Sequence, residues 1–413
     1  MPNLVGIGNS QVPTNAMLGG LAYQDSVGEI NLEKIKARTG DTATDIFVYD
    51  TRKDSDGGAW RKRTKNTSWY NEDESGTRGA RKEFPVVAVI VMESTQCTIY
   101  DADDPNLSMW MVFNFGSGSG IEYKTMFYAG GKAVFALNGM ICFGGNSGWK
   151  DGVAQVKLIE DTAFWRNGTY VAYWTGGIAN RNIAGGYNQF ITDAAKLIAN
   201  QIVNDIAMTV LPNAPIDAET GLPTPTIAVA TDGGVSVIKD NGSVVDHTDS
   251  ANGQSTQVAF TQDGKLTHSH DGHTGIRIDS LKSSDFSYGS NKVARHNSEE
   301  FYINYGLLTS GWSGNVPKLN SGAFSSGGQI VPAQDNILAE NANTGLNLLA
   351  RDFPGSPDNN RVAYITSSYN TGWMIGDIKG ALLSSTDATD VTGSELVTNG
   401  NFDSDVSLSL IHI

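Results

Sequence analysis

Residues 226–246 read Thr226-Ile-Ala-Val-Ala-Thr-Asp-Gly-Gly-Val-Ser-Val-Ile-Lys-Asp-Asn-Gly-Ser-Val-Val-Asp246. Three short β-branched runs are separated by Asp-Gly-Gly and Asp-Asn-Gly. Glycine and asparagine tolerate the positive φ that two-residue hairpin connections need, so the stretch predicts an antiparallel meander. The same pattern returns in residues 257–278, which predicts a second meander that starts about thirty residues later.

Similar strand-turn-strand units occur on both sides of this stretch, in residues 133–145, 153–159, 336–351 and 361–376. Small antiparallel sheets that recur every roughly 30 to 50 residues are typical of a β-propeller, whose blades cannot bury a core alone. We therefore expect an all-β chain with a β-propeller of about six or seven blades. A stack of β-sandwich domains is the alternative, because the period is irregular.

Three further segments complete the expected organisation. Residues 45–50 read as a strand, and residues 86–92 form a continuous apolar run that suits a strand buried on both faces. Residues 190–206 place apolar side chains at helical spacing and predict one inserted helix. We expect an extended N-terminal attachment arm over residues 1–35, a propeller-like domain over 36–390 and a separate C-terminal segment over 391–413.

The overall charge excludes some partners. The chain has 29 Lys and Arg against 44 Asp and Glu, a net charge of −15, and 47 glycines. Phosphate recognition depends on basic clusters, so nucleic acid is excluded as an expected partner. The one basic run, residues 61–65, reads as a solvated edge rather than a nucleic-acid patch. Cys97 and Cys142 lie in apolar runs and read as buried thiols, although a disulfide between them stays open.

No targeting or membrane segment is expected. The start lacks a basic segment followed by an apolar one, and no run of about 18 apolar residues occurs. We therefore expect synthesis in a cytoplasm and no membrane insertion.

Two N-terminal stretches carry a family resemblance. Val12-Pro-Thr-Asn-Ala-Met-Leu-Gly-Gly-Leu-Ala-Tyr-Gln-Asp25 resembles the N-terminal segment of bacteriophage tail fibres and virion structural proteins, and residues 45–72 resemble a segment of structural proteins of marine phages. With residues 203–217, the resemblance covers about half of the chain. It implies attachment to other virion tail proteins through the N-terminal part and contact with a host-surface glycan or receptor through distal modules. Such fibres are commonly trimeric, although no heptads appear here to enforce a homo-oligomer.

The C-terminal segment has a second resemblance. Glu395-Leu-Val-Thr-Asn-Gly-Asn-Phe-Asp-Ser-Asp405 resembles the opening strand of β-sandwich carbohydrate-binding modules. About twenty residues cannot bury a core, so this module is expected to be truncated. The ending from about Val406 looks like translated adapter sequence of the kind found in metagenomic assemblies, and we expect the natural protein to be longer.

One histidine cluster is a candidate metal site. His268, His270 and His273 are spaced so that the first two share a face of a strand and the third returns across the Asp271-Gly272 turn. Three nitrogens at this spacing could bind Zn²⁺ or Fe²⁺. A polar strand edge beside a hairpin is the favoured interpretation, so no cofactor is expected.

Two loop tryptophans are the candidate ligand-binding residues. Trp149 and Trp312 lie in Gly-rich loops, where an indole can stack on a sugar ring and keep its N–H in water. Most tryptophans in proteins are core or interface residues, and of the eight here these two are the best candidates.

Two acidic stretches and the many single carboxylates are candidates for chemistry. Asp54-Ser-Asp-Gly-Gly-Ala-Trp60 resembles the Asp-box of sialidase-like propellers but is one residue short, and such a box is structural. Asp101-Ala-Asp-Asp104 fits either a Ca²⁺ loop or a solvated acidic loop. Glycan hydrolysis needs two carboxylates about 5 to 9 Å apart, which the sequence neither identifies nor excludes.

The expected function is therefore non-enzymatic: a virion tail protein, similar to tail fibres, that acts in tail assembly or in host-surface adhesion. The alternative is a propeller-type tailspike depolymerase that degrades glycans. A pair of facing carboxylates in a central funnel with aromatic walls would favour the enzyme.

Overall fold

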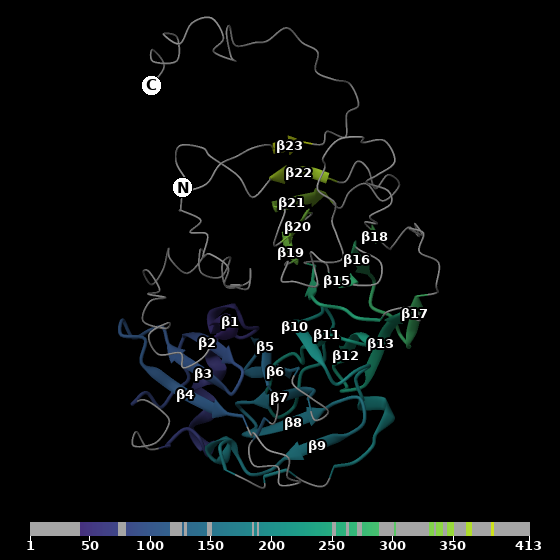
Figure 1. Cartoon of the computed structure of the whole chain (residues 1–413). Helices are drawn as coiled ribbons and strands as arrows, with labels where there is room; N and C mark the ends of the chain where they lie inside the picture. Colours follow the sequence, from purple (N-terminus) through teal and green to yellow (C-terminus); the bar gives the residue numbers. More distant parts are fainter. Residues whose placement is uncertain are drawn as a thin grey trace, which may run out of the picture.

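The computed structural model describes residues 42–72, 80–115, 126–127, 130–146, 151–183, 186–187, 190–249, 253–261, 264–270 and 275–288, together with the short segments 301–302, 330–333, 336–341, 345–350, 361–365 and 381–383. The strands in these residues form five sheets (Figure 1). Within each sheet, strands that follow one another in the chain and pair do so antiparallel, some through short turns and some through longer connections.

The first two sheets come from residues 43–174. The first consists of β1 (Ala43–Asp50), β2 (Val87–Glu93), β3 (Gln96–Asp101) and β4 (Met109–Asn114). The second consists of β5 (Gly131–Leu137), β6 (Met140–Gly145), β7 (Val153–Lys157), β8 (Thr162–Arg166) and β9 (Val171–Trp174). All seven residues of β2 are buried: the six apolar ones as the continuous apolar run predicts, and also Glu93, which follows the run.

One strand of the third sheet comes from the part of the chain that otherwise forms the fourth sheet. The third consists of β10 (Val203–Thr209), β11 (Thr226–Thr231), β12 (Gly234–Ile238), β13 (Val244–Asp249) and β17 (Phe286–Tyr288). The fourth consists of β14 (Val258–Phe260), β15 (Leu266–His270), β16 (Gly275–Asp279) and β18 (Phe301–Tyr302). After β16 the chain returns to the third sheet, where β17 pairs parallel with β13.

A fifth sheet follows, with β19 (Ile330–Ala333), β20 (Asn336–Asn341), β21 (Gly345–Ala350), β22 (Arg361–Ile365) and β23 (Ala381–Leu383). The two predicted meanders are therefore both confirmed, as β11 to β13 and as β14 to β16. The turns of the first have positive φ at the expected glycines, +123° at Gly234 and +80° at Gly242.

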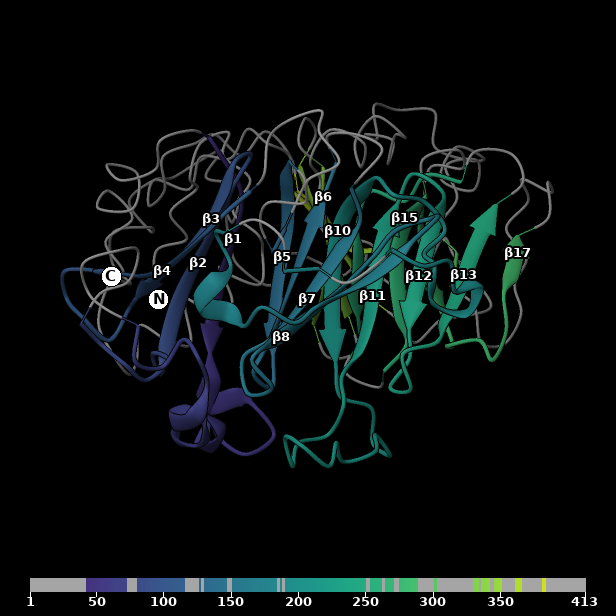
Figure 2. The same cartoon turned by 90° about the horizontal axis from the view of Figure 1, so that it is seen from below.

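The sheets are arranged like propeller blades. The first strand of each sheet contacts the first strand of the next: β1 contacts β5, β5 contacts β10, β10 contacts β14, and β14 contacts β19. Figure 2 shows the first three sheets side by side, from β1–β4 on the left to β13 and β17 on the right. First strands that meet along one line are the inner strands of a propeller, so the chain is an all-β propeller and not a stack of sandwiches.

The described residues supply five of these sheets, and the predicted count of six or seven blades stays a prediction. The predicted arm over residues 1–35 and the segment 391–413 lie outside the described residues.

The predicted helix over residues 190–206 is wrong. This segment contains one 3-10 turn, η4 (Ala194–Lys196), and the beginning of β10. The Asp193 carboxylate accepts a hydrogen bond from the Ala195 amide and caps the short 3-10 turn. The side-chain oxygen of Asn200 accepts a hydrogen bond from the Ile202 amide in the turn that leads into β10. Ile198 is buried in one core cluster between the second and third sheets, so tertiary burial overrides a local helical spacing.

The long connection between β1 and β2 is folded around Asp54. It contains the 3-10 helices η1 (Thr51–Lys53) and η2 (Ala59–Asn66). The Asp54 carboxylate accepts hydrogen bonds from the Tyr49 hydroxyl (2.6 Å), the Trp60 indole (2.7 Å) and the Asn138 amide of the second sheet (2.9 Å). The stretch that resembles an Asp-box therefore has a structural role.

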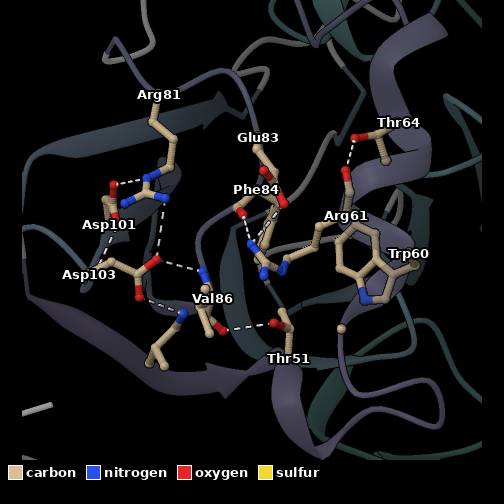
Figure 3. A network of polar contacts seen from close by, with 12 residues as sticks. Thr51, Trp60, Arg61, Thr64, Arg81, Glu83, Phe84, Val86, Asp101 and Asp103 are labelled. Atoms are coloured by element: carbon tan, nitrogen blue, oxygen red, sulfur yellow. Dashed lines mark hydrogen bonds and ion pairs between the residues drawn. The ribbon is translucent and has the colours of Figure 1, made fainter.

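Figure 3 shows how the end of this connection is attached to the first sheet. Arg81 forms ion pairs with Asp101 and, at 3.5 Å, with Asp103. The carboxylate of Asp103 also accepts hydrogen bonds from the amides of Val86 (2.7 Å) and Val87 (3.1 Å). The acidic stretch after β3 is thus saturated by protein donors, and it serves as an anchor where a Ca²⁺ loop was one of two expectations.

Nearby, the basic run is also used internally. Arg61 donates to the carbonyl of Phe84 (2.9 Å) and forms an ion pair with Glu83 (3.2 Å) in the same network (Figure 3).

Cys97 and Cys142 are both buried and both free thiols, so they do not form the disulfide that the sequence left open.

Candidate functional site: a cavity between the second and third sheets

A cavity of about 340 Å³ lies where the second and third sheets meet. Its wall comes from β7, β8 and β9 on one side, from the turn of residues 239–242 on the other, and from the connection of residues 217–225. Its volume falls at the lower end of the range of small-molecule sites. We call it the inter-sheet cavity.

The connection between β10 and β11 is held in a defined conformation. The Asp217 carboxylate accepts hydrogen bonds from the amides of Glu219 (2.8 Å) and Thr220 (2.9 Å). The side chain of Asn138, on the turn between β5 and β6, donates to the carbonyl of Pro223 at 2.9 Å. This wall of the inter-sheet cavity is therefore held against the second sheet by a hydrogen bond.

Arg166, at the end of β8, is the most unusual residue of the cavity wall. Its side chain is only 2% exposed, and burial lowers the pKa of its guanidinium to about 10. The guanidinium donates to the Gln155 side chain (2.9 Å) and to the carbonyls of Gly242 (3.0 Å) and Lys196 (3.3 Å). No carboxylate pairs with it in the described part of the chain, and its Nε has no hydrogen-bond partner there.

Two aromatic rings lie beside this cation. Phe164 and Tyr173 are cross-strand partners on β8 and β9, with ring centroids 4.7 Å apart. The guanidinium of Arg166 lies over the Phe164 ring at 4.6 Å, a cation–π contact. Tyr173 is 41% exposed and presents its ring to the surroundings of the cavity.

The cavity wall carries charges of both signs. Beside Arg166, the Lys196 ammonium is 3.3 Å from the Tyr173 hydroxyl and 3.0 Å from Asp193. The wall also carries Glu160, paired with Lys157 at 2.7 Å, and Asp217, Lys239 and Asp240. Burial is the main cause that raises the pKa of Glu160, and the charge of Asp217 adds to it. The cavity therefore offers both cationic and anionic groups to a ligand.

A second feature, on the inner strands, involves acids that bridge neighbouring sheets. Asp45 lies at a bulge of β1, where its carboxylate accepts hydrogen bonds from the amide of Ile46 (2.8 Å) and from the amide of Val134 on β5 (2.8 Å). The preceding hydroxyl, of Thr44, donates to the carbonyl of Gly131 at 3.0 Å. Two side chains at the β1 bulge therefore bind the β5 backbone, one at an amide N–H and the other at a carbonyl oxygen.

The same arrangement recurs between the third and fourth sheets. Asp205 lies at the corresponding bulge of β10 and accepts hydrogen bonds from the amides of Ile206 (2.9 Å) and Val258 on β14 (3.0 Å). The preceding side chain, Asn204, donates to the carbonyl of Ser255 at 2.9 Å. The recurrence of Thr-Asp-Ile and Asn-Asp-Ile is the sequence signal that would have identified both bridges.

Both bridging acids have perturbed ionisation. Burial raises the pKa of Asp45 and of Asp205 from 3.8 to about 7, and the charge of Asp45 contributes to the shift at Asp205. Lys132 on β5 acts in the opposite direction on both. A depolymerase would require two interacting carboxyls such as these. Here, however, each carboxyl accepts two backbone hydrogen bonds, one on each oxygen, in place of contacts to a substrate.

The predicted site residues are distributed differently. Trp149, Trp312 and His273 lie outside the described residues, and His270 lies on β15. His268 is buried, with its Nε2 3.2 Å from Asp279. Within the described part of the chain no three His, Cys, Asp or Glu side chains gather as a metal site requires. The ligand and metal assignments therefore stay predictions.

The other described tryptophans are core residues. Trp60, Trp69, Trp110, Trp165 and Trp174 are all buried. The sequence interpretation missed Phe164, Arg166 and Tyr173. An arginine at the end of the otherwise apolar run of residues 163–165 was the available signal.

Comparison with known proteins gives little beyond this geometry. No protein-family model and no curated protein matches the chain. Among solved structures, the WD40 repeats of RRP9 match with 9% identity and a TM-score of 0.34, covering 68% of this chain and 77% of that chain. Streptogramin B lyase matches with 9% identity and a TM-score of 0.29, covering 64% and 76%.

The polycomb repressive complex 2 of Chaetomium thermophilum matches with 11% identity and a TM-score of 0.31, covering 64% of this chain and 45% of that chain. The chain spans less than two thirds of the length of the first structures that it matches. Similarity this low carries no argument about function. In the residues that the structure describes, no helix has the length and apolar character needed to span a bilayer.

Proposed function

We propose that this chain is a non-enzymatic structural protein of a bacteriophage tail, acting in tail assembly or in adhesion to a host-surface glycan. The resemblance of residues 12–25 and 45–72 to virion structural proteins supports a place in the tail, with other tail proteins as partners. The strong negative charge also fits a protein that acts without nucleic acid. The inter-sheet cavity is the surface on which a glycan would bind.

One observation favours adhesion over catalysis. Asp45 and Asp205 each use both carboxylate oxygens to accept backbone hydrogen bonds, one of them from the neighbouring sheet. A general acid or nucleophile of a glycosidase must instead direct an oxygen to the substrate. In this proposal the two acids connect the sheets, and the propeller is a rigid platform.

The alternative function, a glycan-degrading depolymerase, has one specific observation in its favour. Asp45 and Asp205 interact electrostatically, and the pKa of each is raised to about 7, which suits proton transfer at neutral pH. An enzyme would need these carboxyls to exchange their backbone partners for a substrate.

The test compares retention with turnover. The full chain is incubated with a panel of purified bacterial surface polysaccharides, and both retention on the immobilised polymer and release of new reducing ends are measured. Retention without release is expected. Release of reducing ends that disappears in Asp45→Asn would replace adhesion by depolymerase activity, and the absence of retention on every polymer would overturn the adhesion role.

A further inference from the structure

In the described part of the chain, no carboxylate lies within ion-pair distance of the buried guanidinium of Arg166; Asp193 acts on it from farther away and is itself paired with Lys196 at 3.0 Å. Buried charges in proteins are normally paired, because removal from water is costly and only an opposite charge with full hydrogen bonding offsets it. Arg166 is 2% exposed, its described hydrogen-bond partners are neutral, and one of its N–H groups has none. Arg166 lines the inter-sheet cavity. An anionic group bound there would therefore give the guanidinium an opposite charge at contact distance.

The rest of the cavity adds further requirements. The exposed ring of Tyr173 lies beside Lys196 and next to the Phe164 ring. Aromatic faces can pack against the C–H groups of a sugar ring. Glu160 and Asp217 also line the cavity, and a carboxylate can accept hydrogen bonds from hydroxyl groups and repels a second anion.

From this arrangement we infer that the inter-sheet cavity binds an acidic sugar, with its anionic group at Arg166, its ring against Tyr173 and its hydroxyl groups toward Glu160 and Asp217. The volume of about 340 Å³ suits one or two sugar rings, the terminal part of a surface polysaccharide. This inference names the ligand class for the adhesion role and rests on that proposed function. A uronic acid and a sugar phosphate present the same chemistry to the guanidinium, whose fork binds carboxylate and phosphate alike.

The experiment measures binding of four probes to the full chain by ligand-observed NMR titration: glucuronate, glucose 6-phosphate, glucose and inorganic phosphate. We expect one of the two anionic sugars to bind at least tenfold more tightly than glucose. Glucuronate as the tighter probe identifies a uronic acid, and glucose 6-phosphate identifies a sugar phosphate. Binding of glucose as tightly as the anionic sugars would overturn the inference. Binding of inorganic phosphate as tightly as either anionic sugar would also overturn it, because the site would then hold an adventitious ion only.

Matched variants locate the site. Tyr173→Ala should weaken binding at least fivefold, whereas Tyr170→Ala should leave it unchanged, because both tyrosines are 41% exposed and only Tyr173 lines the cavity. Arg166→Gln should abolish binding while circular dichroism confirms folding. If that variant does not fold, Lys196→Gln, beside Arg166 and Tyr173, should weaken binding. Equal losses in the two tyrosine variants would contradict the proposed place.

The same variants separate this inference from the function on which it rests. Polysaccharide retention that Tyr173→Ala leaves intact would overturn the cavity as the binding site while adhesion itself stands. Release of reducing ends together with probe binding at Tyr173 would instead support the site and overturn the non-enzymatic role.

Discussion

The strongest quantitative prediction concerns Asp45 and Asp205, the acids that connect neighbouring sheets. In the unfolded chain both carboxyls are ionised above about pH 4, whereas in the folded protein each keeps its proton until about pH 7. Between these values the unfolded chain binds fewer protons than the folded one, so stability falls as the pH rises. Below pH 4 both states are protonated, and above pH 7 the full loss is present.

The magnitude follows from the size of the shift. From pH 5.5 to pH 8, a folded-state pKa of about 7 removes about 2 kcal/mol per carboxyl, at about 1.4 kcal/mol per pH unit. Both side chains keep some contact with solvent, which reduces the loss to about 1 kcal/mol each, or about 2 kcal/mol for the pair. For a domain of this size that corresponds to a Tm difference of about 4 to 8 °C.

The assay is thermal unfolding of wild type and of Asp45→Asn/Asp205→Asn at pH 5.5 and pH 8. Asparagine has the shape of the protonated acid and cannot ionise, so the decrease in Tm between the two pH values should be about 4 to 8 °C smaller in the double variant. Asp240→Asn, at an exposed position, is the control and should behave like wild type. An equal decrease in the double variant and in wild type would refute the role assigned to these acids.

Three further predictions test the packing. Gly131→Ala should destabilise the protein by about 3 kcal/mol, because an added Cβ would lie 2.3 Å from a backbone oxygen, whereas the exposed Gly168→Ala should change stability by less than about 0.5 kcal/mol; chemical denaturation measures both. Trp60→Phe removes the indole donor to a buried carboxylate and should cost about 1 to 3 kcal/mol, measured in the same way; an unchanged midpoint would contradict the structural role of that carboxylate. Cys97 and Cys142 should not react with a thiol reagent in the folded protein and should both react in denaturant, because burial raises the pKa of each thiol, to about 12 for Cys142; fast reaction without denaturant would show that the core is open.

Several features were predictable from short stretches of sequence. The turns at Gly234 and Gly242 require backbone conformations that glycine adopts readily, so the meander of β11 to β13 follows from local chemistry. The burial of the six apolar residues of β2 follows from its continuous apolar run. The all-β class rests on such patterns, repeated along the chain.

Other features depend on segments far apart in the chain. Residues 190–206 have the spacing of a helix, yet the burial of Ile198 against the third sheet decides their conformation. The inter-sheet cavity combines Arg166 with residues 217–225 and 239–242, and no local pattern contains all of them.

The sequence by itself therefore determined the all-β class and many of the strands and turns, because backbone conformation responds to neighbouring residues. The choice of a propeller over a stack of sandwiches came from contacts between sheets. Only the tertiary structure decided which side chains share a cavity and which carboxyls lose their ordinary ionisation. Val134 and Asp45 meet across 89 positions of the chain, and only the packing of two sheets brings that amide to that carboxylate. Desolvation and charge pairing arise from such contacts, so they appear only when the sheets are assembled.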